Sequence, residues 1–96
     1  MRMVQASLLR MNGGPGTANE AHILDELLWA HASAAHHLEH LRVRPAPYGL
    51  GLMVFVRADT EARALARAHA LLDAVRQPLR ALGYTVGTTP SPNPHR

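Results

Sequence analysis

The sequence predicts an α+β fold, and three observations lead to this prediction. Residues 48–58 form a long apolar run outside any helical pattern, with strand-prone residues in its second half. A segment with apolar residues at helical spacing lies on each side of that run. Short alternating segments, typical of strands, lie near both ends of the chain and directly before the run. The predicted order is β-α-β-β-α-β, the ferredoxin-like arrangement of a four-stranded antiparallel sheet with two helices on one face.

The first predicted strand, residues 3–9, leads into a glycine-rich loop. Residues 12–16 of that loop can adopt positive φ angles almost anywhere. A loop of this kind at a helix N-terminus can bind an anion, because free N–H groups and the helix dipole point towards it. The pair Pro15-Gly16 resembles ACT domains, a resemblance that implies a regulatory module with an amino-acid ligand near this loop. The alternative is a plain β–α connection. The candidate ligand-binding residues are Gly13, Gly14, Gly16 and Thr17.

The first predicted helix begins near Ala18, because Thr17 and Glu20 fit a capping box. We expect this helix to end near His36 or His37. Its apolar stripe consists of Leu24, Leu27, Leu28, His31, Ala35 and Leu38.

Trp29 stands alone on the polar face of this helix. An exposed tryptophan often marks an interface, so Trp29 is a candidate contact residue. The alternative is that its ring lies flat over residues 45–47 or over the C-terminal tail.

A cluster of histidines falls at the end of the same helix. On a helix, His36 and His40 would lie four residues apart on one side, as metal sites with two histidines require. His36, His37 and His40 are therefore candidate metal ligands, although surface histidines commonly bind nothing. His31 lies on the apolar stripe, where it is either a hydrogen-bonded core or interface residue or a functional group facing a pocket.

The two middle strands form the centre of the prediction. Residues 40–44 alternate as an edge-like strand with the apolar side chains inward and the basic ones outward, and residues 45–49 turn the chain. Both faces of the strand in residues 48–58 are apolar, so both should be buried. The helices can cover one face, and a second copy of the chain would cover the other, which predicts a homodimer. The candidate interface residues are Leu50, Leu52, Val54 and Val56, together with Trp29; the opposite face carries Gly51, Met53 and Phe55.

A second helix should follow, capped by Asp59 or Thr60. Pro78 removes a backbone donor, so we expect a kink or break there, and Gly83 predicts the end of the helix. Residues 84–86 form a short last strand. The apolar stripe of the second helix consists of Leu65, Ala68, Leu72, Val75, Leu79 and Leu82.

The central strand resembles the RNP1 signature of RRM domains in its glycines, Gly49 and Gly51, and in its last aromatic, Phe55. That resemblance supports the topology. RRM domains stack bases on aromatic residues at the positions held here by Leu50 and Leu52, so the stacking platform has become aliphatic. We therefore expect no binding of nucleic acid.

Composition sets the remaining limits. The chain has 96 residues and no cysteine, so it has no disulfide and no thiolate metal site. All ten basic residues are arginine, which indicates a GC-rich bacterial genome, and the net charge of +3 is mild and scattered. No signal peptide and no membrane span is recognisable, so we expect a cytoplasmic protein without a membrane partner. Residues 1–88 should form one domain, and the Pro-rich residues 89–96 a flexible tail.

These observations favour a small non-enzymatic binding, regulatory or accessory module that needs no cofactor and works as a homodimer through its sheet. A protein partner or a small-molecule ligand would complete it. The first alternative is a cofactor-free enzyme of the dimeric α+β-barrel type, similar to monooxygenases or cyclases, with His31 as general base and Ser7 or Gln5 assisting. The second is a metal-binding protein that uses the histidine cluster.

Overall fold

The structure is a computed structural model that describes residues 1–87 and 91–92. The strands are β1 (Arg2–Arg10), β2 (Leu38–Ala46), β3 (Gly49–Val56), β4 (Tyr84–Val86) and β5 (Ser91–Pro92). The helices are α1 (Ala18–His31), the short 3-10 helix η1 (Ala34–His36), α2 (Glu61–Ala74) and α3 (Arg76–Ala81).

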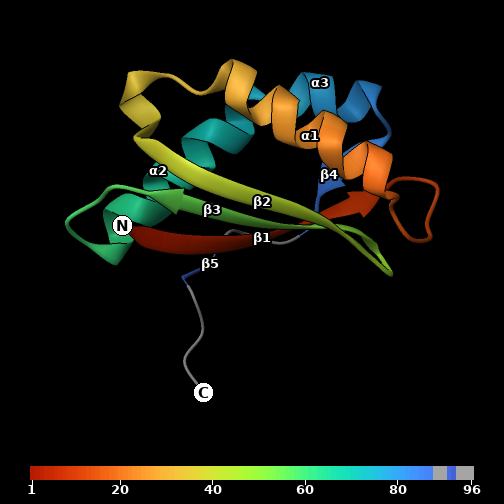
Figure 1. Cartoon of the computed structure of the whole chain (residues 1–96), viewed down its shortest axis with the longest axis horizontal. Coiled ribbons are helices and arrows are strands. Elements are labelled where there is room, and N and C mark those ends of the chain that lie inside the picture. The colour runs from red at the N-terminus through yellow and green to blue at the C-terminus, as the bar shows by residue number, and fades with distance from the viewer. Residues whose placement is uncertain (88–90, 93–96) are drawn as a thin grey trace.

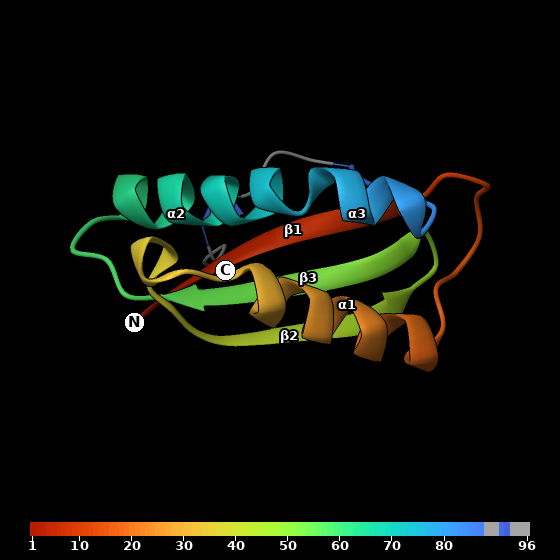
Figure 2. The ribbon, with the colours of Figure 1, turned by 90° about the horizontal axis from the view of Figure 1, so that it is seen from above.

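The strands form one antiparallel sheet in the order β2-β3-β1-β4, and β5 also pairs with β1. β3 therefore lies between β1 and β2, which follow each other in the chain but do not pair. The helices lie on one face of the sheet (Figures 1 and 2), with α1 over the β2 side and with α2 and α3 over the β1 side. The predicted α+β class with an antiparallel sheet is confirmed.

Side-chain alternation divides the sheet into a face that packs against the helices and a face that does not. The helix-facing side chains are apolar and join the helices in a single core. Its members from the sheet are Val4, Ala6, Leu8, Leu41, Leu50, Leu52, Val54, Val56 and Tyr84, and those from the helices include Ala21, Leu24, Leu28, Ala64, Ala68, Leu71, Leu72 and Leu79.

This core corrects the predicted interface. Leu50, Leu52, Val54 and Val56 are each at most 2% exposed within a single chain, because α1 and α2 cover them. They are not available to a second copy of the folded chain. The opposite face of β3 would have to make any contact through the sheet.

The prediction that the first helix continues to His36 or His37 is wrong, although its predicted start at Ala18 and its capping box are confirmed. α1 ends at His31, because the backbone of the next residue is extended with φ −71° and ψ 131°. The chain then makes the short turn η1. At its start, the N–H of Ser33 donates a hydrogen bond to Nδ1 of the His36 ring at 3.0 Å. His40 consequently lies on β2 rather than on a helix.

The predicted break in the second helix is real, but it lies three residues earlier than Pro78. α2 ends at Ala74, and Val75 has φ −105° and ψ 7°. A proline ring clashes with the carbonyl four residues before it, which here belongs to Ala74, so the distortion falls ahead of the proline. The predicted cap, Thr60, and the predicted helix end before Gly83, which has φ 87°, are confirmed, but Leu82 from the predicted stripe is exposed.

The predicted flexible tail falls mostly outside the described residues. Within it, Ser91 and Pro92 form β5 opposite Gln5 and Val4 of β1. This short part of the tail therefore belongs to the sheet.

Candidate functional site

A depression lies around Gly51, in the face of the sheet that does not pack against the helices. This face, which carries Ser7, Arg44, Gly51, Met53 and Phe55, is called the uncovered face below. In the paired register, Gly51 of β3 stands between Ser7 of β1 and Arg44 of β2. The glycine contributes no side chain to this row, so the neighbouring side chains surround a hollow of about 320 Å³. The hollow is lined by Gln5, Ala6, Ser7, Arg44, Pro45, Ala46, Tyr48, Gly51, Leu52 and Met53.

The uncovered face carries positive charge along β2. Strand alternation places Arg42 and Arg44 on this face with His40, whose ring lies 5.4 Å from that of Phe55. The nearby acidic residue Glu39 does not pair with these arginines: its Oε2 lies 3.4 Å from Nε of Arg57. Among residues 1–87 and 91–92, neither Arg42 nor Arg44 forms an ion pair.

The sequence contained part of this site. It indicated that the basic side chains of the second strand point outward and that Gly51 shares a face with Met53 and Phe55, but it placed that face opposite the predicted interface. It did not show that Ser7, Gly51 and Arg44 share one row, because that depends on the register of three strands. Nor did it show that Tyr48 of the turn folds back towards Gly51.

The glycine-rich loop has a structural role at its end nearest the helix. The N–H of Gly16 donates to the carbonyl oxygen of Gly49 at 2.9 Å, and a methyl group on Gly16 would overlap that oxygen. Gly13 and Gly14 have φ angles of 79° and 89° and are exposed. Of the four predicted ligand-binding residues, Gly13 and Gly14 thus lie in an exposed turn, Gly16 contacts β3, and Thr17 caps α1.

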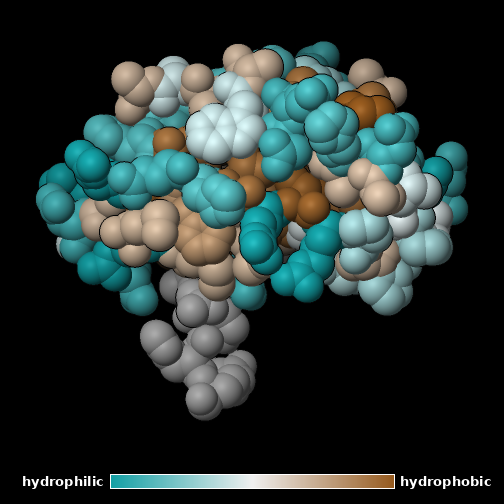
Figure 3. Space-filling view, viewed as in Figure 1, coloured by the Kyte–Doolittle hydropathy of each residue, from teal (hydrophilic) through white to brown (hydrophobic). Residues whose placement is uncertain are grey.

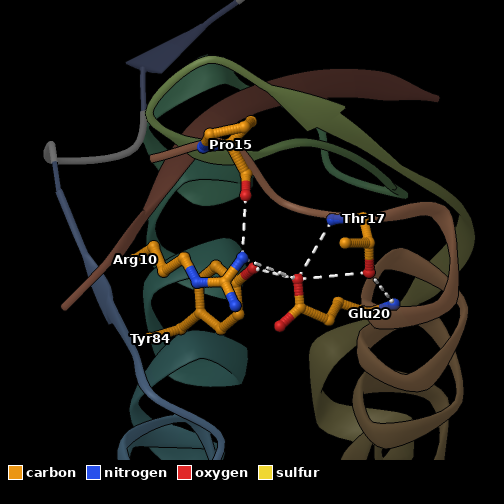
Figure 4. A network of polar contacts seen from close by, with 5 residues as sticks. All are labelled: Arg10, Pro15, Thr17, Glu20 and Tyr84. Atoms are coloured by element: carbon orange, nitrogen blue, oxygen red, sulfur yellow. Dashed lines mark hydrogen bonds and ion pairs between the residues drawn. The ribbon is translucent and has the colours of Figure 1, made fainter. Parts of the chain in front are cut away.

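The chain's own carboxylate occupies the start of α1, where an anion would bind (Figure 4). Glu20 Oε1 accepts hydrogen bonds from the Thr17 N–H at 3.0 Å and from the Tyr84 hydroxyl at 2.9 Å. The Arg10 guanidinium lies 3.3 Å from the same oxygen and also donates to the carbonyl of Pro15 at 2.8 Å. Glu20 and Thr17 accept hydrogen bonds from each other's backbone N–H groups at the start of the helix. Fewer free N–H donors therefore remain there for an external anion.

This network shifts two pKa values in opposite directions. The hydrogen bond from Tyr84 is the largest cause that holds the pKa of Glu20 below its usual value of 4.5, and Thr17 and Arg10 act in the same direction. Burial raises the pKa of Tyr84 above its usual 10.0, and the bond to Glu20 adds to that rise. Both shifts favour the arrangement of a charged carboxylate and a neutral phenol.

The structure separates the predicted metal ligands. His36 lies in η1, His37 has a left-handed backbone with φ 52°, and His40 lies on β2. His36 Nδ1 already accepts the N–H of Ser33. Within the described ranges, no three His, Asp or Glu side chains lie close enough together to hold a metal ion.

His31, the predicted general base, is exposed at the C-terminal end of α1. Its Nδ1 lies 3.0 Å from the carbonyl oxygen of Leu27 and donates to it. The predicted assisting residues, Gln5 and Ser7, line the depression on the other side of the sheet. The three residues are therefore not brought together.

Trp29 is exposed on α1, with 43% of its surface accessible, as expected for the polar face. Beside the N-terminal half of the same helix, a groove of about 380 Å³ separates α1 from β2. Its lining includes Ala21, Val43 and Pro45, and apolar surface is visible in this region between α1 and β2 (Figure 3). None of the residues that line this groove is a histidine of the predicted cluster.

In the part of the chain that the structure describes, no helix is long and apolar enough to cross a membrane.

The resemblance to RNP1 does not extend to the orientation of the strand. Leu50 and Leu52, at the positions where RRM domains stack bases, face the core. Comparison with known proteins found no family model, no curated protein and no solved structure that matches this chain.

Proposed function

We propose that this chain is a small non-enzymatic binding module with a ferredoxin-like fold, and that it works as a homodimer through the uncovered face of its sheet. The strand order β2-β3-β1-β4 and the single helical layer support the ferredoxin-like arrangement. The binding role rests on one observation. The uncovered face combines apolar side chains with a depression large enough for a small ligand.

The apolar part of this face favours association. Met3, Met53 and Phe55 occupy it and are only partly shielded within one chain. Phe55 and Met53 stand on the central strand, where a second sheet would pack most closely. Covering apolar side chains of this size contributes about 25 cal/mol per Å² removed from water.

The edges of the sheet are less suited to pairing than its face. β2 forms one edge, and it carries Arg42, Arg44 and Pro45. Charged side chains and proline on an edge strand oppose the addition of another strand. These residues favour contact through the face over contact through this edge.

The test is the oligomeric state of the tag-free protein, measured by native mass spectrometry and sedimentation velocity at micromolar concentration. We expect a dimer for the wild type and a monomer for Met53→Glu, because the variant places a charge in the centre of the contact. Ala70→Glu, which introduces the same charge at an exposed position of α2, should remain dimeric. Circular dichroism verifies that both variants are folded. A monomeric wild type, or a dimer that Met53→Glu leaves unchanged, contradicts contact through this face.

A further inference from the structure

We propose that the depression over Gly51 binds a small organic carboxylate, with Arg44 as the residue that recognises its charge. This inference rests on the proposed binding function and names the ligand class. It concerns a site other than the glycine-rich loop, the histidine cluster and the buried face of β3.

The shape of the site comes from the residue that lacks a side chain. A methyl group on Gly51 would lie 3.4 Å from the Tyr48 hydroxyl oxygen and 3.9 Å from Cγ of Arg44. Both distances are ordinary van der Waals contacts, so the hydroxyl and the arginine stem close around an unfilled position. The backbone conformation at this position does not require glycine, because the φ angle of Gly51 lies outside the positive range that favours glycine.

The polar groups around the hollow are suited to an anion. Arg44 offers a planar set of N–H donors that matches the two oxygens of a carboxylate. The hydroxyls of Ser7 and Tyr48 and the amide of Gln5 add neutral donors from β1 and from the β2–β3 turn. Within the described residues, none of these four side chains is engaged in a hydrogen bond with another side chain.

The charge of the surroundings points in the same direction. Arg42 is adjacent on the same face of β2, and no acidic side chain of the described residues lines the hollow. An anion placed there meets positive potential and no repulsion from a lining carboxylate. A neutral or cationic ligand would leave Arg44 without a counter-charge.

The walls and the volume narrow the class to an organic acid. Met53, Pro45 and Ala46 present carbon atoms to the hollow, which favour a ligand with an apolar body attached to its charged group. The volume of about 320 Å³ lies at the small end of the range for ligand pockets. A single-ring or short aliphatic acid fits these limits better than inorganic phosphate, which has no apolar part.

The test is an NMR titration of the full ¹⁵N-labelled chain with benzoate, using benzamide as the neutral match in shape and inorganic phosphate as the hydrated anion. We expect saturable shifts for benzoate, centred on the amides of Ser7, Gly51 and Arg44. Benzamide and phosphate should produce no saturable shift at these amides.

Two variants and one control locate the site. Arg44→Gln should weaken benzoate binding at least about tenfold, as expected for loss of a charged hydrogen-bond partner. Gly51→Val should abolish binding by filling the hollow, while the strand accommodates its β-branched side chain. Arg80→Gln removes the same charge from an exposed position of α3, and this variant should bind benzoate as the wild type does. The unfolding temperature of each variant shows that it is folded.

Each result decides the inference. The inference is supported by saturable benzoate shifts that Arg44→Gln weakens, Gly51→Val abolishes and Arg80→Gln keeps. Absence of saturation in the folded wild type, shifts centred elsewhere, an equal loss in Arg80→Gln, or equal binding of phosphate overturns it. Sedimentation of the same samples separates the two proposals. A dimer without benzoate binding overturns this inference alone, and a monomer that binds benzoate overturns only the dimer.

Discussion

Glu20 connects distant parts of the chain through a single oxygen atom. Its Oε1 is shared by the guanidinium of Arg10, the N–H and hydroxyl of Thr17, and the hydroxyl of Tyr84 (Figure 4). Tyr84 is almost completely buried, so its hydroxyl needs a partner inside the protein. The capping box was recognisable in the sequence because it is local. The contribution of Tyr84, 64 residues away, required the fold.

This network predicts a loss of stability in acid. Since the pKa of Glu20 is lower in the folded than in the unfolded chain, its contribution is complete above the unfolded value of about 4.5 and is lost as the pH falls through the folded value. Tyr84→Phe removes the largest cause of the shift and should make the dependence on pH shallower. Urea unfolding from neutral pH down to about pH 3 measures this. Tyr48→Phe, whose hydroxyl lies outside the network, is the control. Equal slopes for Tyr84→Phe and the wild type would contradict the role of Tyr84.

At the scale of elements, the order of strands and helices was predictable and some of their ends were not. Alternation and helical spacing determine which segments are strands and which are helices, because each must bury one apolar face. The end of α1 depends instead on an extended residue, Ala32, and on the bond between Ser33 and the ring of His36. The apolar spacing continues through Ala35 and Leu38, so it gave no sign of this break. The predicted metal site relied on that missing part of the helix.

The β1–α1 loop is held to the sheet by a close contact at one glycine. Gly16→Ala would drive a methyl group into the carbonyl of Gly49, and we expect it to destabilise the fold by about 1–3 kcal/mol, as overpacking does. Asn12→Ala, an exposed change in the same loop, should have little effect. Thermal and urea unfolding of both variants make the comparison. Equal stability of the two would show that the loop moves away from β3 at little cost.

At the scale of the whole molecule, the uncovered face presents a conflict between apolar attraction and like charge. Met53 and Phe55 favour contact between two copies, but the positively charged Arg42 and Arg44 lie on the same face. The sequence predicted that one sheet face would need a cover, and it assigned the wrong residues to that face. It could not show the conflict, because the arginines and the apolar residues come from different strands. Their proximity follows from the pairing of β2 with β3.

This conflict links the two proposals. Pairing two copies brings their arginines together, so a carboxylate bound beside Arg44 should strengthen the dimer by reducing repulsion. By thermodynamic reciprocity, the dimer should then bind the carboxylate more tightly than the monomer does. Sedimentation equilibrium with and without benzoate measures the dimer dissociation constant. We expect benzoate to lower it in the wild type and leave it unchanged in Arg44→Gln. Added sodium chloride should also lower the dimer dissociation constant in the wild type and in Arg44→Gln, because salt screens repulsion between exposed like charges. A dimer that salt weakens would instead be held by attraction between opposite charges, which the described side chains of this face do not supply.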